Sequence, residues 1–183
     1  MVKKIFILIF IIFLFLLSSS NSFSQEITSP SADRQSTPSS YQLAYPGILP
    51  DHQLYKLKVL RDKLIPLFIS SPQKKIEFYL LQTDKGIFAT SMLVKKGKID
   101  LAKETGLKAE HNYTILTYIV KSNKWSISDK EYKKLYDAAL KHQEVLQSII
   151  KSLPKNQQET FQKIFYFSKQ NLNEIKIAQY TLD

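Results

Sequence analysis

Histidine is the side chain most often used for metal binding and for proton transfer near neutral pH, and this chain has three histidines. His142 falls among apolar residues at helical spacing, so we predict a hydrogen-bonded histidine in a core. His52 follows an aspartate and His111 follows a glutamate, positions that indicate capping or surface roles. Neither Glu-x-x-His nor His-x-x-x-His occurs, so the histidines form no pair of metal ligands on one helical face. We therefore expect no metal site.

Other residue patterns that carry chemistry are also missing from the sequence. Because there is no cysteine, covalent haem attachment through Cys-x-x-Cys-His is impossible. The four glycines are too dispersed for a phosphate-binding loop, and no Gly-x-Ser-x-Gly nucleophile turn occurs. Glu104 and Lys108, four residues apart, fit a surface ion pair better than part of a catalytic carboxylate pair. We therefore predict no catalytic residue, no cofactor and no enzymatic activity.

Aromatic residues are abundant, with ten tyrosines and eleven phenylalanines. Such side chains could line a pocket for a lipid or a quinone-like molecule. Most of them recur at helical spacing together with aliphatic residues, which is the pattern of a packed core. We adopt the core interpretation, and an apolar ligand site stays open as the alternative.

The first 24 residues have the pattern of a secretory signal peptide. Lys3 and Lys4 supply positive charge, and an unbroken apolar run follows at residues 5–17. This run is shorter than the ~20 apolar residues of a membrane-spanning helix. Ser22 and Ser24 fit the small residues of a cleavage site, which would leave residue 25 as the new N-terminus. We predict an exported protein, secreted or extracytoplasmic in the cell envelope, with an uncleaved N-terminal membrane anchor as the alternative.

The net charge bears on the class of partner. Removal of residues 1–24 takes away two lysines and no acidic residue, so the charge falls from +10 to +8. Arg34 and Arg61 are the only arginines, and lysine is poorly suited to bidentate recognition of phosphates or bases. Nucleic acid is therefore not the expected partner. An envelope protein or an anionic envelope polymer stays open, and we expect membrane contact only through the signal segment.

Two segments precede the helices. Residues 25–40 are rich in serine, threonine, proline and glutamine, which predicts a disordered linker. Residues 41–183 are expected to form the folded domain. Its first part combines turn-forming and large apolar residues, so we interpret it as either a docking surface or a strap that braces the helices. The residues of this candidate segment are Tyr45, Pro46, Gly47, Leu49, Pro50, Asp51 and Tyr55.

The rest of the domain has the pattern of five helices joined by short breaks. The first is expected from about residue 52 to residue 69, with Asp51 as its N-cap. Pro66 should cause a kink or an early end of this helix, because proline removes a backbone hydrogen bond. The apolar residues at helical spacing share one face, which we expect to be packed. They are Leu54, Leu57, Leu60, Leu64 and Leu67.

The later helices are marked by start and stop signals. Ser71 followed by proline starts the second helix, and a lysine-glycine-lysine break near residue 97 ends it. The third ends in a loop that carries Trp125. Ser128 and Glu131 form the capping box of the fourth, a proline stops it, and the fifth follows. Long amphipathic helices with short connections predict an all-α fold, an antiparallel up-and-down bundle of four to five helices.

Small residues in the second and third helices bear on how closely the two can pack. Gly86 should weaken the second helix by about 1 kcal/mol relative to alanine. Ala102, Gly106 and Ala109 share one face of the third helix. We expect this face to permit close approach of a neighbouring helix.

A motif at residues 45–52 resembles that of a known family. It consists of Tyr-Pro-Gly-Ile-Leu-Pro-Asp-His and is followed by Tyr-Lys-Leu-Lys at 55–58, Arg-Asp at 61–62 and Pro-Gln-Lys-Lys at 72–75. These residues resemble the signature of an uncharacterised bacterial family of exported helical proteins, a domain of unknown function. The likeness covers residues 41–97, and Ala44, Gly86 and Ile87 depart from the pattern. The resemblance implies export and helices, and it transfers no activity, cofactor or site residue.

Two functions fit these observations. The first is a non-enzymatic binding or structural module of the bacterial cell envelope, because the motif-rich segment has no catalytic groups beside it. The second is an extracytoplasmic sensor or carrier that holds a small apolar ligand within the bundle. A partner bound through the motif would favour the first function, and a ligand chamber between helices would favour the second.

Overall fold

The computed structural model describes residues 40–122 and 127–180, with the side chain of residue 180 excepted. These residues belong to one compact unit that spans residues 37–183. The predicted signal peptide, residues 1–24, lies outside the described residues. So do residues 25–39 of the predicted linker and Trp125 of the predicted loop. In the described part of the chain, no helix has both the length and the apolar character needed to cross a bilayer.

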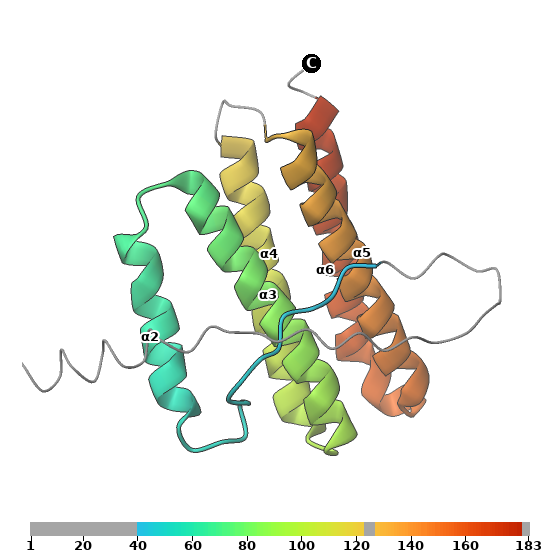
Figure 1. Ribbon diagram of the computed structural model, residues 1–183. Helices are drawn as coiled ribbons and strands as arrows, with labels where there is room; N and C mark the ends of the chain where they lie inside the picture. Colours follow the sequence, from blue (N-terminus) through green and yellow to red (C-terminus); the bar gives the residue numbers. More distant parts are fainter. Residues whose placement is uncertain (1–39, 123–126, 181–183) are drawn as a thin grey trace, which may run out of the picture. The chain divides into compact units, whose positions relative to one another are not determined.

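The described residues form five helices and no strand, so the all-α prediction is confirmed. The helices are α2, Tyr55–Phe68; α3, Pro72–Lys95; α4, Ile99–Ser122; α5, Asp129–Ser152; and α6, Lys155–Tyr180 (Figure 1).

Local sequence explains most of the helix ends. Ser128 accepts a hydrogen bond from the backbone of Glu131, and the Glu131 side chain accepts one from the backbone of Ser128, which completes the predicted capping box of α5. Gly97, with a φ of +71°, ends α3, and the next amide donates back to the carbonyl oxygen of Leu93 at 2.9 Å. Helix α2 includes Pro66 and ends at Phe68, one residue before the expected end at about residue 69.

Helices α3 to α6 form a four-helix bundle. Helix α3 packs on α4 and α5, and α6 packs on the same two helices. The direction of the chain alternates from one helix to the next, so α3–α4 and α5–α6 are antiparallel hairpins (Figure 1). The neighbours that join the two hairpins, α3 with α5 and α4 with α6, are parallel. Antiparallel neighbours therefore occur within each hairpin, whereas the consecutive helices α4 and α5 lie on the diagonal.

The bundle has two apolar clusters, one toward each end. The first joins the start of α3 to the end of α4, and the second joins the end of α3 to the start of α4. Helices α3 and α4 approach closely at the level between the two clusters. A Cβ atom added to Gly86 would lie only 2.6 Å from Cβ of Ala109. The predicted close approach is thus present, and it gives Gly86 a packing role. The largest buried apolar side chains are Tyr113, Phe161, Ile87, Leu93, Leu116, Leu135, Leu146, Ile164 and Ile175.

Helix α2 lies beside the bundle and departs from two predictions. Among the described residues it lacks the close packing that joins the other four helices, and none of its side chains is buried. The expected packing of its leucines is therefore wrong. The predicted N-cap role of Asp51 is also wrong, because α2 begins at Tyr55 and the Asp51 carboxylate instead binds Lys96 and Lys98. Those lysines flank the turn between α3 and α4.

Candidate functional site

A layer of polar side chains crosses the middle of the bundle. Each of the four helices contributes to it, and in each helix the polar residue lies between residues of the two apolar clusters. On α3, for example, Asp84 lies between Leu80 and Ile87. The spacing is helical, so a polar residue at this position must point into the core. The buried members of the layer are Asp84, Glu110, His142, Ser168 and Asn171.

Asp84 is the acceptor at the centre of this layer. Its Oδ1 atom lies 2.7 Å from Nε2 of His142 on α5, and its Oδ2 atom accepts a hydrogen bond of 2.7 Å from the hydroxyl of Tyr41. The Tyr113 ring meets the His142 ring edge to face, with centroids 5.5 Å apart. The Tyr113 hydroxyl donates to the carbonyl oxygen of Leu135. The prediction that His142 is a hydrogen-bonded core histidine is confirmed.

Glu110 is the second carboxyl group of the layer. Its Oε2 atom accepts a hydrogen bond of 3.1 Å from Nδ2 of Asn171, whose own oxygen accepts one from Thr114. Burial raises the pKa of Glu110, and the nearby His142 together with the bonds from Asn171 and Ser168 opposes that rise. Glu110 Oε1 and His142 Nδ1 have no hydrogen-bond partner among the described residues. The layer is therefore incompletely satisfied at two atoms.

An aspartate paired with a histidine could in principle move protons, but this pair is enclosed. Exposed fractions are 3% for Asp84, 1% for Glu110 and 0% for His142, so a substrate would reach them only if the bundle opened. The bonds of the layer instead join the α3–α4 hairpin to the α5–α6 hairpin. We interpret the layer as a structural element that fixes the register of the two hairpins.

The predicted candidate segment lies against the bundle. Pro46 and Leu49 are buried, whereas Tyr45 is 66% exposed and meets the Phe88 ring edge to face. Gly47 has a φ of +67°, a conformation that glycine adopts without steric cost. Asp51 binds the two lysines of the α3–α4 turn, and hydrogen bonds from Lys98 and Lys96 lower its pKa to about 2.

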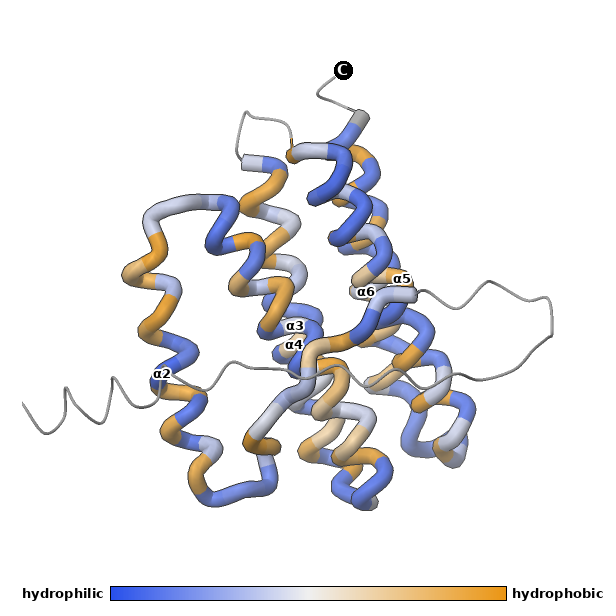
Figure 2. Tube along the Cα trace, in the orientation of Figure 1, coloured by the Kyte–Doolittle hydropathy of each residue, from blue (hydrophilic) through white to orange (hydrophobic). Residues whose placement is uncertain are grey.

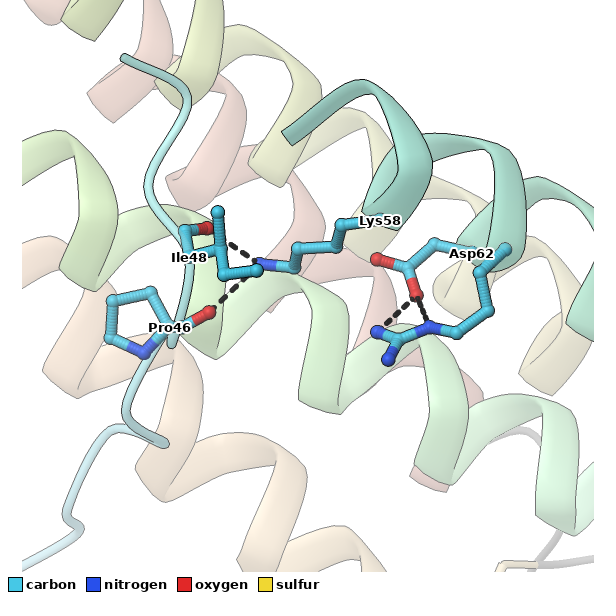
Figure 3. A network of polar contacts seen from close by, with 5 residues as sticks. Pro46, Ile48, Lys58 and Asp62 are labelled. Atoms are coloured by element: carbon cyan, nitrogen blue, oxygen red, sulfur yellow. Dashed lines mark hydrogen bonds and ion pairs between the residues drawn. The ribbon is translucent and has the colours of Figure 1, made fainter. Parts of the chain in front are cut away.

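The same segment holds helix α2 in place. Lys58 of α2 donates hydrogen bonds from Nζ to the carbonyl oxygens of Pro46 at 2.8 Å and Ile48 at 3.3 Å (Figure 3). Burial lowers the pKa of Lys58, which is the expected effect of withdrawing an ammonium group from water. One turn further along α2, Asp62 accepts a bond of 2.7 Å from Arg61. The segment therefore connects α2 to the bundle through backbone acceptors.

A small cleft lies between α2 and the α3–α4 hairpin. Pro50 and Tyr55 of the candidate segment line it, together with Lys58, Lys85 and Ala109. Its volume is about 60 Å³, well below the roughly 300–1,000 Å³ of sites that hold drug-sized ligands. This cleft is therefore not the apolar chamber that the predicted carrier would require.

The outward face of α2 is apolar. Exposed fractions are 64% for Leu57, 58% for Leu60, 47% for Leu64, 76% for Leu67 and 84% for Phe68. Figure 2 shows apolar residues along α2 as well as along the four helices of the bundle. We call these five residues the α2 face. A contiguous exposed apolar surface of this kind marks an interaction site in most soluble proteins.

Sequence reasoning found His142 but missed Asp84, which it contacts, and Asn171, which binds Glu110 in the same layer. Asp84 and Asn171 each occupy an apolar helical stripe, and a search for polar residues on such stripes would have found both. His52 lies on the surface, where its Nδ1 atom accepts a hydrogen bond from the amide of Leu54, and His111 is also exposed. In the described residues, no cluster of histidine and acidic side chains has the arrangement of a metal site.

No protein-family model, curated protein or solved structure matches this chain.

Proposed function

We propose that this chain is an exported, non-enzymatic binding module of the bacterial cell envelope, with the α2 face as its binding surface. The observation that carries the proposal is the exposure of five large apolar side chains on one face of one helix. Such a face costs solubility unless a partner covers it. The N-terminal pattern of Lys3, Lys4 and the apolar run at residues 5–17 supports export.

The segment at residues 45–51 serves, in this proposal, as a strap that positions α2. Its Pro46 and Leu49 are buried, its carbonyl groups hold Lys58, and its Asp51 binds the α3–α4 turn. If substitution of Tyr45 and Pro46 lowers the melting temperature without loss of a bound partner, the strap role is supported. Loss of a partner with unchanged melting would assign the docking role to this segment instead.

Membership of the family with the Tyr-Pro-Gly-Ile-Leu-Pro-Asp motif belongs to the same proposal. The motif residues gather where the strap meets α2, since Pro46 is bonded to Lys58 and Tyr55 lies on the adjoining turn. In this interpretation the motif residues attach α2 to the strap, so that the apolar face of α2 points outward.

Export can be tested with alkaline phosphatase fused after residue 183, because this enzyme needs disulfides that form outside the cytoplasm. We expect activity from the intact fusion and none from a fusion that lacks residues 5–17. N-terminal sequencing of the exported fusion then distinguishes a cleaved signal peptide from a retained anchor. An inactive intact fusion that is stable and cytoplasmic would contradict the export proposal.

Binding through α2 can be tested by covalent surface labelling of the chain in isolated cell envelopes and after purification. We expect Leu57, Leu64 and Phe68 to be labelled in the purified protein and protected in the envelope. Tyr118 on α4, which is 71% exposed, is the internal control and should be labelled equally in both. Equal labelling of the α2 face in both samples would refute its role as the binding surface.

A further inference from the structure

The α2 face has a specific charge environment. Lys56, Arg61 and Lys63 are exposed along the same helix. Its one acidic residue, Asp62, is turned inward with 16% of its side chain exposed, and it is bound to Arg61. The exposed surface of α2 therefore combines leucines with positive charge and has no exposed carboxylate of its own.

The apolar surface extends past the end of the helix. Leu67 and Phe68 are its most exposed members and lie at the turn into α3. Lys74, in the first turn of α3, is exposed close by in the sequence. An apolar tip beside cationic side chains is the pattern of helices that lie in a membrane interface, with the apolar side in the acyl region and lysines at the headgroups.

The inward side of α2 is committed to the rest of the protein. Tyr55, Lys58 and Asp62 are half-buried and line the cleft against α3 and α4, and Lys58 is bonded to two strap carbonyl groups. Rotation that would turn the leucines toward α3 would break these bonds. The strap thus holds the apolar side outward.

A second copy of this chain fits the α2 face less well than a lipid surface does. A two-fold symmetric dimer presents the same surface to itself, so Lys56, Arg61 and Lys63 of one copy would lie close to those of the other. Like charges brought together in this way repel. A surface of anionic headgroups over an acyl layer complements both the charge and the leucines.

We propose that the α2 face docks on an anionic lipid membrane, with the axis of α2 parallel to the membrane surface. Leu57, Leu60, Leu64 and Phe68 enter the acyl region, and Lys56 and Lys63 meet the lipid phosphates. This inference rests on the proposed function, and it adds a membrane contact beyond the signal segment. In this arrangement α2 attaches the bundle to the membrane, and the strap fixes the orientation of α2.

The test is co-sedimentation of residues 25–183 with vesicles, at several salt concentrations. This fragment contains the whole compact unit, residues 37–183, and lacks the apolar run at residues 5–17, which would bind vesicles by itself. We expect binding to vesicles of phosphatidylglycerol mixed with phosphatidylcholine. Binding to pure phosphatidylcholine should be weaker by about tenfold or more, and salt should weaken binding to the anionic vesicles.

Two variants separate the apolar and the charged contributions. Leu57→Ser with Leu64→Ser should weaken binding by at least about tenfold, because two leucines no longer enter the acyl region. Lys56→Gln with Lys63→Gln should weaken binding to anionic vesicles by about fivefold for each lysine, with little effect on phosphatidylcholine. Matched controls are Leu107→Ser, at an exposed leucine of α4, and Lys130→Gln with Lys155→Gln, and these should bind as the unsubstituted protein does. Circular dichroism establishes that each variant is folded.

Several outcomes would overturn the lipid proposal. They are absence of vesicle binding, equal loss of binding in the α2 variants and the controls, or a dimer in solution that the Leu57→Ser, Leu64→Ser protein no longer forms. Protection of the α2 face in the purified full-length chain without lipid would assign the face to residues 5–17 instead. If vesicles are not bound but α2 is protected in the envelope, the partner is a protein and the proposed function stands. If the α2 face is not protected in the envelope, both the lipid proposal and the proposed function are contradicted.

Discussion

The polar layer and the α2 face both place side chains in environments that their chemistry disfavours. The layer puts Asp84, Glu110 and His142 into a closed core, and α2 turns leucines toward solvent. The buried groups are compensated within the chain, because hydrogen bonds replace most of the lost water contacts. Among the described residues, nothing covers the leucines. The contrast indicates that the layer serves the fold and that α2 serves a partner.

Removal of the Asp84 carboxylate should have the largest effect on stability. Asp84→Ala removes the carboxylate that contacts the buried Nε2 atom of His142 and accepts from Tyr41, so we expect the free energy of unfolding to fall by about 3–5 kcal/mol. Urea denaturation followed by circular dichroism measures this change. Glu104→Ala is the matched control, since Glu104 forms an exposed pair with Lys108 and should contribute less than about 1 kcal/mol. Similar losses in the two variants would remove the contrast between a structural layer and an ordinary surface.

A double-mutant cycle sharpens the same contrast. If Asp84 and His142 act as a unit, the losses for Asp84→Ala and His142→Ala should not add, and the coupling free energy should be about 0.5–3 kcal/mol. The denaturation midpoints of the two single variants and the double variant give this value. Additive losses would mean that the 2.7 Å contact contributes little and that each side chain acts through packing alone.

The pH dependence of stability tests the environment of Glu110. Its folded-state pKa is raised above 4.5, so the folded chain holds a proton that the unfolded chain releases. The stability contributed by Glu110 is therefore full below the unfolded pKa and is lost as pH rises through the folded pKa, by at most about 1.4 kcal/mol per pH unit. Glu110→Gln should remove this decline and leave the Asn171 Oδ1 bond to Thr114 intact. A curve unchanged by the substitution would place the titration elsewhere.

The smallest effect is expected on α2. Leu60→Ser with Leu64→Ser should change the unfolding free energy of the purified protein by no more than about 0.5 kcal/mol, because both side chains are already exposed. Leu146→Ala in the core is the control, with an expected loss of about 2–5 kcal/mol. Denaturation curves for the two proteins measure the difference. A large loss on α2 would show that its leucines pack within the chain.

Helical spacing and capping residues predicted the helices well, because those signals act over a few residues. The capping box at Ser128 and the Ser71-Pro72 start of α3 are examples. Spacing also predicted which leucines of α2 share a face, but it could not predict that the face points outward. That orientation is set by Lys58, whose acceptors at Pro46 and Ile48 are ten or more residues away.

The polar layer could be predicted only in part for a related reason. His142 was recognised because histidine among apolar residues stands out, whereas Asp84 was not singled out. The pairing of Glu110 with Asn171 joins residues 61 positions apart, and no local pattern encodes it. The diagonal placement of α4 and α5 likewise depends on which faces meet, which short connections do not determine.

The distribution of the polar layer between the two hairpins bears on the order of folding. Both carboxyl groups, Asp84 and Glu110, belong to the α3–α4 hairpin, and their partners His142 and Asn171 belong to the α5–α6 hairpin. The contacts within each hairpin are local, whereas the bonds between hairpins close long loops, so we expect the hairpins to form before they dock. During synthesis the α3–α4 hairpin is made before His142 and Asn171, so we expect Asp84 and Glu110 to stay hydrated until the second hairpin docks. We therefore expect the hydrated carboxyl groups to disfavour premature collapse of the first half, and the docking step to favour the alignment that pairs Asp84 with His142 and Glu110 with Asn171.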